Sequence, residues 1–250
     1  MPQTFSGRIA LVTGAAQGIG RAIAAALHAA GARVHVADID HEGLAPTASW
    51  GAVIHHLDLG DRAACHAVVE AVRAAEGGLH ILVNAAGGVR GQVGRPIEEI
   101  GEDDWRVIFE ANIDGAFWLA QACAPVMKAA RYGRIVNIAS GAGLRPSLTG
   151  IQAYCAAKHA LVGITRQLSW ELAPHGITVN AVAPGFILSN PASRRQWDSY
   201  GPDGQNRFVE SIHARRLGTP EDIANATLFF AAEATGWVSG QILSVDGGRS

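Results

Sequence analysis

Tyr154 and Lys158 stand four residues apart in the stretch AYCAAKHA (153–160). Because an α-helix repeats every 3.6 residues, a helix here would place the phenol and the ammonium on one face, one turn apart. The three residues between them are small, so no bulky group would separate the two side chains. Such a pair can form a proton-transfer site, although the same spacing also occurs on solvated helix faces that have no function.

A phenol beside a cation is suited to general acid–base chemistry on an alcohol or a ketone. Oxidation of an alcohol by hydride transfer also requires loss of the hydroxyl proton, and phenol, with an ordinary pKa of about 10, is a poor base near neutral pH. Lowering that pKa by about 3 units requires about 4 kcal/mol, which nearby positive charges in a partly dry site can supply. We therefore expect Tyr154 to be the general base in oxidation and the general acid in reduction.

A glycine-rich turn, TGAAQGIG (13–20), follows an apolar run and precedes a helical stretch. Gly14 permits a tight turn out of the strand, Gly18 a close approach of backbone to phosphate, and Gly20 close packing of the helix on the sheet. The free N–H groups at the start of the helix favour a pyrophosphate. The cofactor-binding residues expected in this turn are Gly14, Gln17, Gly18, Ile19 and Gly20.

Asp38 is expected at the end of the second strand. A carboxylate at this place accepts hydrogen bonds from the ribose hydroxyls of an adenosine and repels a 2′-phosphate. Gln17 carries no positive charge that would offset this repulsion. The sequence therefore favours NAD over NADP, and a solvated strand end is the alternative interpretation of Asp38.

Short apolar runs alternate with longer helical stretches along the whole chain. The runs are rich in Val and Ile, which is typical of strands buried on both faces of a parallel sheet. The alternation predicts βαβ units and a doubly wound α/β fold with helices on both faces of the sheet. The expected strands are 8–13, 33–38, 53–58, 80–84, 134–139, 177–183 and 241–246, and the expected helices are 18–30, 61–75, 103–130, 152–173 and 220–232.

Several helix ends carry capping signals. A Thr-Pro-Glu-Asp capping box occupies 219–222, and Gly31 and Gly176 follow helical stretches, where a left-handed residue is favoured. Segment 186–216 has no clear periodicity, which is typical of functional or mobile loops. No linker divides the chain, so we expect one nucleotide-binding domain, 1–250, with 186–216 as its substrate-binding segment.

The composition excludes several classes of protein. The chain has 250 residues, a net charge of −2 and 48% hydrophobic residues, so it can form a large core but offers no basic surface to nucleic acid or anionic membranes. No apolar run is long enough to span a bilayer, and the N-terminus has no apolar signal core. The three widely spaced cysteines favour a cytoplasmic protein. No cluster of residues has the spacing of metal ligands, so we expect no catalytic metal.

Several motifs give the sequence a resemblance to a known family. They are TGAAQGIG (13–20), NAAG (84–87), Asn112, Ser140 and YCAAK (154–158), and the similarity continues to VDGG (245–248). In this combination the chain resembles the classical short-chain dehydrogenase/reductases over nearly its whole length. The resemblance implies an oxidoreductase with a nicotinamide cofactor, a seven-stranded parallel Rossmann sheet of order 3-2-1-4-5-6-7, and a homotetramer formed through two long helices and the C-terminal strand region.

The resemblance also implies a role for each residue of the site. Asn112, Ser140, Tyr154 and Lys158 would form the catalytic tetrad: Ser140 would hydrogen-bond the reacting oxygen, Lys158 would hold the nicotinamide ribose, and Asn112 would hold a water beyond Lys158. Family members often have Thr at the position of Ser189. The remaining cofactor contacts would be Asp58 and Leu59 at the adenine, Asn84, Ala86 and Gly87 at the fourth strand, Pro184, Gly185 and Ile187 beside the nicotinamide, and Ser189 at its carboxamide.

The family's pocket is built from the loop after Ser140, the residues before Tyr154 and segment 186–216. Several arginines there favour a carboxylate or phosphate on the substrate, because guanidinium binds such groups bidentately. Solvated loop arginines are the alternative, with a neutral polyol, a sugar or a small cyclic or aromatic alcohol as substrate. The expected substrate contacts are Arg145, Gln152, Phe186, Arg194 and Trp197.

Three functions remain open. We favour an NAD-dependent dehydrogenase of a small secondary alcohol, sugar, polyol or hydroxy acid. An NADPH-dependent reductase of 3-oxoacyl groups on a carrier protein is the alternative, and Asp38 argues against it. A nucleotide-binding sensor without catalysis is a third, disfavoured because all four residues of the tetrad are present.

Overall fold

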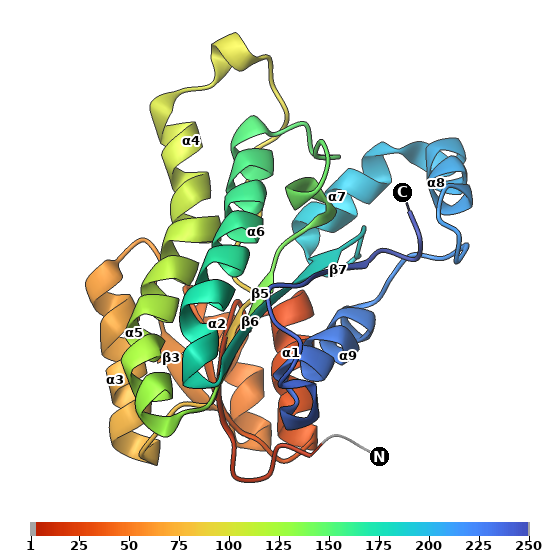
Figure 1. The fold of residues 1–250 in the computed structure, drawn as a ribbon. Coiled ribbons are helices and arrows are strands. Elements are labelled where there is room, and N and C mark those ends of the chain that lie inside the picture. The colour runs from red at the N-terminus through yellow and green to blue at the C-terminus, as the bar shows by residue number, and fades with distance from the viewer. Residues whose placement is uncertain (1–3, 250) are drawn as a thin grey trace.

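Seven parallel strands form one sheet in the order β3-β2-β1-β4-β5-β6-β7. The computed structural model describes residues 4–249, and helices cover both faces of the sheet (Figure 1). This architecture confirms the predicted doubly wound Rossmann fold. The strands are β1 Ile9–Thr13, β2 Arg33–Asp38, β3 Val53–His56, β4 Ile81–Asn84, β5 Gly133–Ile138, β6 Ile177–Pro184 and β7 Ile242–Val245.

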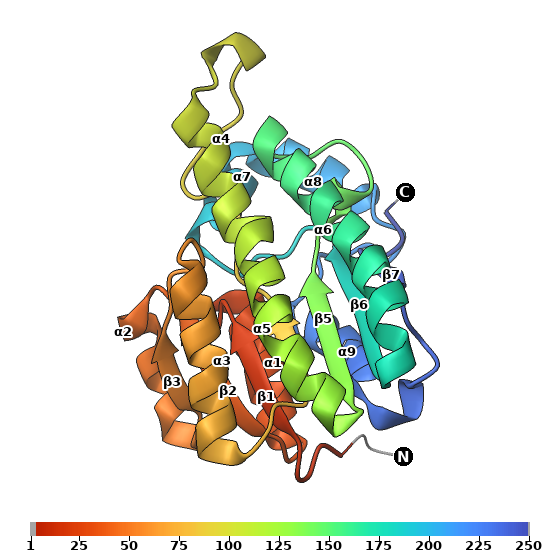
Figure 2. The ribbon, with the colours of Figure 1, turned by 60° about the vertical axis from the view of Figure 1, so that its left-hand side comes forward.

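The helices form one layer on each face of the sheet. Helices α1 and α9 pack against each other on one face, and α3, α5 and α6 cover the other (Figures 1 and 2). Figure 2 shows α4, α7 and α8 beyond the end toward which the β5 arrow points. The helices are α1 Gly18–Ala29, α2 His41–Leu44, α3 Arg62–Glu76, α4 Glu102–Phe109, α5 Gly115–Ala130, α6 Gln152–Leu172, α7 Pro191–Ser199, α8 Gly201–Glu210 and α9 Pro220–Ala231.

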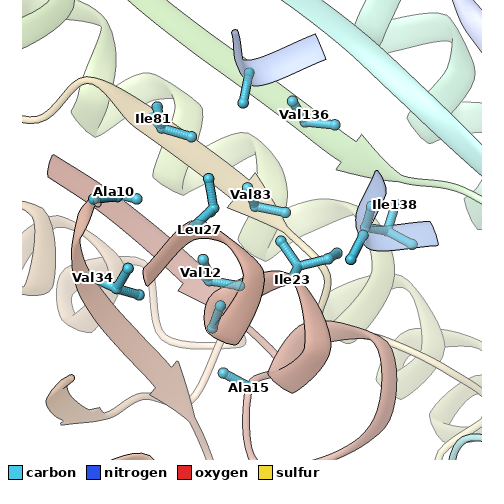
Figure 3. Close-up of a cluster of buried hydrophobic side chains, with 14 of the residues drawn as sticks. Ala10, Val12, Ala15, Ile23, Leu27, Val34, Ile81, Val83, Val136 and Ile138 are labelled. Carbon is cyan, nitrogen blue, oxygen red and sulfur yellow. The ribbon is translucent and has the colours of Figure 1, made fainter. Parts of the chain in front are cut away.

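The core beneath α1 shows why the strands are apolar on both faces. Ile23 and Leu27 of α1 lie over the sheet among Val12, Val34 and Val83, and all five are buried (Figure 3). Each fully buried aliphatic side chain of this kind stabilises the fold by about 1.5–3 kcal/mol. The alternate residues of the same strands, such as Leu11 and Leu82, are buried against α3 and α5 on the opposite face. Burial on both faces holds the strand ends, and the residues that follow them, in fixed positions.

The predicted helix ends are confirmed at the points that carried capping signals. Thr219 Oγ1 accepts a hydrogen bond from Asp222 N at 3.3 Å, and the Asp222 carboxylate accepts one from Thr219 N at 2.9 Å. Gly31 and Gly176 have φ angles of +95° and +78°, in the left-handed region that favours glycine.

Two segments differ from the prediction. Stretch 103–130 is helical throughout as predicted, but a π-helical turn, Glu110–Asp114, lies between α4 and α5. Segment 186–216 contains α7 and α8, and α7 begins at a capping box in which Asn190 accepts a hydrogen bond from Ser193 N at 2.9 Å. The residues Asn190 and Pro191 are an N-cap and first-turn signal that the search for periodicity missed.

Candidate active site

A cavity of about 750 Å³ lies at the carboxyl-terminal edge of the sheet, lined by residues that follow β1, β2, β4, β5 and β6. This is the edge at which doubly wound sheets bind their ligands. The lining brings together these predicted site residues: Gly14, Gln17, Gly18, Ile19, Gly20, Asp38, Asp58, Leu59, Ala86, Gly87, Ser140, Arg145, Tyr154, Lys158, Pro184, Gly185, Phe186, Ile187 and Ser189.

Tyr154, Ser140 and Lys158 meet in this cavity. Tyr154 and Lys158 both lie on α6, and the Lys158 ammonium nitrogen is 5.8 Å from the centroid of the Tyr154 ring. Ser140 follows β5, and its Oγ accepts a hydrogen bond from Ala142 N at 3.1 Å. Because that contact occupies a lone pair, the Ser140 hydroxyl proton remains available for its hydrogen bond to the Tyr154 oxygen, which lowers the pKa of Tyr154. The side chains are thus positioned to share a reacting oxygen.

The electrostatics of the protein differ from the expectation for Tyr154. Burial raises the pKa of Tyr154 above its ordinary value, and the hydrogen bond with Ser140 opposes this only in part. Lys158 is only 4% exposed, and burial lowers its pKa to about 8. Its Nζ donates to the Ile138 carbonyl oxygen at 3.0 Å. In the protein alone, therefore, desolvation outweighs the expected effect of Lys158 on the phenol.

Asn112 lies outside the cavity lining, in the π-helical turn between α4 and α5. Its Nδ2 donates to the carbonyl oxygens of Gly88 and Ile108, and its Oδ1 accepts from Gly88 N at 2.9 Å. A Cβ atom placed on Gly87 would lie 2.5 Å from Asn112 Oδ1 and 3.4 Å from Lys158 Nζ. Asn112 therefore fixes the loop after β4 and borders the same small space as Lys158.

Asn84 also lies outside the lining, in a buried polar network that crosses the sheet. Asn84 Nδ2 donates to Asn137 Oδ1 at 2.8 Å, and Asn137 Nδ2 donates to Thr165 Oγ1 at 2.9 Å. The network ties β4 and β5 to α6, the helix that carries Tyr154. Asn84 therefore lies behind the cavity wall, to which the neighbouring Ala86 and Gly87 contribute. Its contact with a cofactor stays a prediction.

The glycine-rich turn is closed by backbone contacts. Gly14 has a φ angle of +68°, and a Cβ atom there would lie 2.6 Å from Ala86 N. Gly18 has a φ angle of +54°, and its Cβ atom would lie 2.6 Å from the Ser189 carbonyl oxygen. A Cβ atom on Gly20 would meet the Gly14 carbonyl oxygen at 2.2 Å, so Gly20 is required by the turn itself rather than by packing of the helix on the sheet.

Acidic residues gather at the end of the cavity formed by β2 and β3. Asp38 accepts hydrogen bonds from Ala16 N at 3.0 Å and from Asp40 N at 3.1 Å, which fix its carboxylate beside the turn. Asp58 is held by Gly60 N at 2.9 Å. A carboxylate has about four acceptor positions, so both side chains keep free lone pairs toward the cavity.

The substrate end of the cavity retains only some of the predicted contacts. Phe186 and Arg145 line it, but Gln152, Arg194 and Trp197 do not. Gln152 donates to the Arg95 carbonyl oxygen at 2.9 Å, and Arg194 is exposed. The Trp197 ring packs 5.9 Å from that of Phe186 and supports it from behind. None of these three residues lines the cavity: Gln152 begins α6, whereas Arg194 and Trp197 lie on α7. Their contact with a substrate stays a prediction.

Sequence reasoning missed two features of the site. Arg249, which directly follows VDGG (245–248), lines the cavity although it is the penultimate residue of the sequence. Asn137 and Thr165 complete the network behind Tyr154. Neither had a local signal, because each acquires its place through contacts between distant segments.

Within residues 4–249, no group of three or more His, Cys, Asp or Glu side chains could hold a metal ion, and no helix there is long and apolar enough to cross a membrane.

The cavity fits an extended dinucleotide. Its volume lies within the range of about 300–1,000 Å³ that is typical of ligand sites. Gly18 and Gly87 both line the cavity, and a Cβ atom would collide with Ser189 at the first position and with Asn112 at the second. Helix α1 directs its free N–H groups to the same place, as a pyrophosphate requires.

Comparisons with known proteins agree with this geometry. A family model described as enoyl-(acyl carrier protein) reductase matches residues 14–250. The chain is 39% identical to the (2S)-[(R)-hydroxy(phenyl)methyl]succinyl-CoA dehydrogenase subunit BbsD of Thauera aromatica, covering 97% of this chain and 96% of the relative. It is 38% identical to the 3-oxoacyl-[acyl-carrier-protein] reductase FabG of Escherichia coli K12, covering 98% of each.

A solved structure gives the same result. A protein assigned as an NAD(P)-dependent gluconate 5-dehydrogenase from Beutenbergia cavernae, with NADP bound at low occupancy, superimposes with a TM-score of 0.88 at 36% identity, covering 99% of this chain and 98% of that one. The chain belongs to the classical short-chain dehydrogenase/reductase family, nicotinamide-dependent oxidoreductases that act on alcohols and ketones.

Proposed function

We propose that the protein is an NAD-dependent oxidoreductase that transfers a hydride between the cofactor and a small secondary alcohol or ketone. The observation that carries this proposal is the meeting of Ser140, Tyr154 and Lys158 in a cavity whose other end is formed by Asp38. The first three residues are suited to proton transfer, and the last to an adenosine without a 2′-phosphate.

The cofactor would lie along the carboxyl-terminal edge of the sheet. Gly14 to Gly20 and the start of α1 would hold its pyrophosphate, Asp38 and Asp58 its adenosine, and Gly185 to Ser189 its nicotinamide end. When bound, it supplies the hydride acceptor or donor and, in the oxidised form, a positively charged ring. That charge would act on Tyr154 in addition to Lys158.

Tyr154 would remove the hydroxyl proton during oxidation and return it during reduction. Because burial raises its pKa in the protein alone, Tyr154 depends on nearby positive charge to become a base near neutral pH. Ser140 would donate a hydrogen bond to the reacting oxygen and stabilise the charge that develops there. The contact of its Oγ with Ala142 N fixes the direction of that hydroxyl.

The proton would leave Tyr154 by way of Lys158. Lys158 Nζ and Asn112 Oδ1 border the same space beside Gly87, and a water molecule needs two to four polar partners of this kind. Since both N–H groups of the Asn112 side chain are used by backbone carbonyls, the partners it can offer are the second lone pair of Oδ1 and its own backbone carbonyl. Asn112 would thus hold the loop and the relay water together.

The preference for NAD rests on the residues around Asp38. Ile39 and Asp40 line the same end of the cavity, and no lysine or arginine does so there among residues 4–249. The nearby Arg21 is directed to the carbonyl oxygens of Ala16 and Gly43. A 2′-phosphate would therefore meet two carboxylates and no cation, which disfavours NADPH and the 3-oxoacyl reductase alternative.

Self-association as a homotetramer is part of the proposal. Of the apolar residues on the two long helices, Leu119 and Leu161 belong to the core, whereas Trp170 is 77% exposed and Trp237, before β7, is fully exposed. Such side chains on the α6 and β7 side are suited to contact with another copy. Sedimentation as a monomer at micromolar concentration would remove this part.

The decisive experiment measures turnover with NAD across sugars, polyols, hydroxy acids and aromatic secondary alcohols. We expect Tyr154→Phe to abolish turnover while NADH binding, followed by fluorescence, changes little. We also expect kcat/KM to be at least about 100-fold higher with NAD than with NADP, equivalent to about 3 kcal/mol. Retention of more than about a tenth of the turnover in Tyr154→Phe would contradict the catalytic assignment, and a preference for NADP would contradict that of Asp38.

A further inference from the structure

The end of the chain folds back over the substrate end of the cavity. After β7, Gly247 and Gly248 have φ angles of +69° and +83°, and the Ala214 N–H donates to the Gly247 carbonyl oxygen at 2.9 Å. A Cβ atom on Gly247 would lie 2.6 Å from Ile212 Cγ2, so this turn packs tightly on the segment after α8. The turn delivers Arg249 to the cavity lining.

Arg145 holds this turn in place and is itself occupied. Its Nη1 donates to the Arg249 carbonyl oxygen at 2.6 Å, and its Nη2 lies 3.2 Å from Asp246 Oδ2. Asp246 in turn packs against Gly185, where a Cβ atom would lie 2.8 Å from the Asp246 Cα. The positive charge of Arg145 is therefore balanced by Asp246, and its main effect is to tie the Ser140 loop to the end of the chain.

Arg249 differs from Arg145 in that no carboxylate of the described residues balances its charge. Within residues 4–249, no carboxylate forms an ion pair with its guanidinium. The guanidinium carbon lies 4.2 Å from the centroid of the Phe208 ring. Stacking uses the flat face of a guanidinium and leaves its in-plane N–H groups free, and it fixes a side chain that is otherwise mobile.

Phe208 belongs to an aromatic cluster that forms one wall of the cavity. The Phe186 ring lines the cavity, and its centroid lies 5.3 Å from that of Phe208, 5.9 Å from that of Trp197 and 6.0 Å from that of Tyr200. Three supporting rings hold Phe186 rigidly, so it offers a flat apolar surface beside the Arg249 guanidinium. This combination suits a ligand that is both planar and anionic.

The distribution of carboxylates along the cavity also favours an anionic group at the substrate end. Its lining carboxylates, Asp38, Asp40, Asp58 and Glu110, all lie toward the adenosine end, since Glu110 itself approaches Gly60. The lining residues from Ser140 to Thr149 and from Phe186 to Gln196 contribute no carboxylate. Among the lining residues that the structure describes, an anion at the substrate end would therefore meet Arg249 and no carboxylate.

We propose that Arg249 is the specificity-determining residue of the active site and that the substrate is a cyclic or aromatic secondary alcohol, or the matching ketone, that carries a carboxylate. The carboxylate pairs with the Arg249 guanidinium while the ring packs on Phe186. This inference rests on the proposed function for the identity of the reacting group, but the binding of the anion can be measured without turnover.

The test compares two ketones of equal size, 4-acetylbenzoate and its neutral amide, 4-acetylbenzamide. In the presence of saturating NAD a ketone cannot be reduced, so calorimetry on the full chain reports binding alone. We expect the wild type to bind the carboxylate about 10- to 100-fold more tightly, the range for a charge-assisted pair. Arg249→Gln should remove this preference, and Arg195→Gln, which removes an exposed arginine outside the cavity, should leave it intact.

Three results would overturn the assignment: no binding of the carboxylate to the wild type, equal binding of the two ketones, or a preference that survives in Arg249→Gln. If Arg90→Gln removed the preference and Arg249→Gln kept it, the anion would be assigned to Arg90, which also lines the cavity. Failure of the proposed function is seen separately, as turnover that persists in Tyr154→Phe. The two failures are distinguishable because the binding preference does not depend on Tyr154.

Discussion

Burial of Lys158 makes the stability of the protein depend on pH. Its pKa falls from 10.5 to about 8 because the ammonium is desolvated in the fold. The unfolded chain therefore binds more protons than the folded one between these values, so the unfolding free energy rises with pH in this window. At 1.36 kcal/mol per pKa unit, the burial costs about 3 kcal/mol at pH 7 and about 1 kcal/mol at pH 9.5. Lys158→Met keeps the length of the side chain and removes the charge.

The expected result is a difference that shrinks with pH. Urea unfolding should show that the unfolding free energy of the wild type, relative to that of Lys158→Met, rises by about 2 kcal/mol from pH 7 to pH 9.5. A neutral amine still donates to the Ile138 carbonyl, so the variant lacks this hydrogen bond at both pH values. The chain has only one other lysine, Lys128, which is paired with Glu171 at 3.8 Å near the surface, so Lys128→Met should show no such pH dependence.

The same property permits a direct measurement. With two lysines in the chain, carbon NMR of the ε positions should show two titrating signals, of which one moves with a pKa near 8 and disappears in Lys158→Met. A Lys158 signal that titrates near 10.5 would refute the reasoning. So would a difference between wild type and Lys158→Met that stays constant from pH 7 to pH 9.5, because desolvation would then not be the dominant effect.

Three further predictions concern the cofactor turn, an acid-sensitive pair and a helix cap. Gly18→Ala should weaken NADH binding at least about tenfold in a fluorescence titration, because the new Cβ atom would collide with Ser189. Gly77→Ala is the control: Gly77 also has a positive φ angle, +80°, but open space around it. It should cost about 1–2 kcal/mol of stability and leave NADH binding unchanged. His55 is half-buried beside His35, and partial burial lowers its pKa to about 4, so the stability present above pH 6.5 is lost as the pH falls toward 4. Urea unfolding at pH 7 and pH 5 should therefore show a smaller loss of stability in His55→Asn than in the wild type. Asp222→Asn should lower Tm by about 2–4 °C at pH 7 in a thermal melt, because the carboxylate holds both Arg216 and the Thr219 N–H.

Local patterns predicted the fold because both faces of the sheet are buried. Strands such as β1 and β6 are buried at every residue, so their sequences are nearly continuous apolar runs that stand out from the amphipathic helices. The π-helical turn between α4 and α5 could not be predicted in this way, because it changes the hydrogen bonding without changing the apolar pattern. The sequence around Asn112 therefore did not predict that its side chain binds the carbonyl oxygens of Gly88 and Ile108.

The site was predictable where it follows a strand directly. Ser140 and Asp38 each come at or just after the end of a buried strand, so their places follow from the fold. Arg145 and Arg249 illustrate the opposite case. Both are single arginines in irregular segments, and only the folded chain shows that one is neutralised by Asp246 while the other stacks on Phe208. No local pattern distinguishes an arginine that holds a loop from one that faces a ligand.

The strand order explains why the two ends of the cavity can differ so much in character. The chain leaves β1 toward β2 and enters β4 on the other side of β1, so the loops after β1 and β4 diverge and leave a crevice between them. Its floor is closed by Thr13 Oγ1, which accepts hydrogen bonds from Ala85 N and Ala86 N at 3.2 Å each.

Because that floor consists of backbone and small side chains, it tolerates little change, as the 2.6 Å approach of a Cβ on Gly14 to Ala86 N shows. The substrate end is built differently, from Phe186 and Arg249, which are separated from the floor by whole helices in the sequence. Substitutions at Arg249 can therefore alter which substrate binds while the proton-transfer group and the cofactor turn keep their geometry. For this reason the binding preference and the turnover of Arg249→Gln should change independently: its kcat with a neutral aromatic alcohol should stay within about twofold of the wild type. A large fall in that kcat would show that the end of the chain also positions the reacting groups.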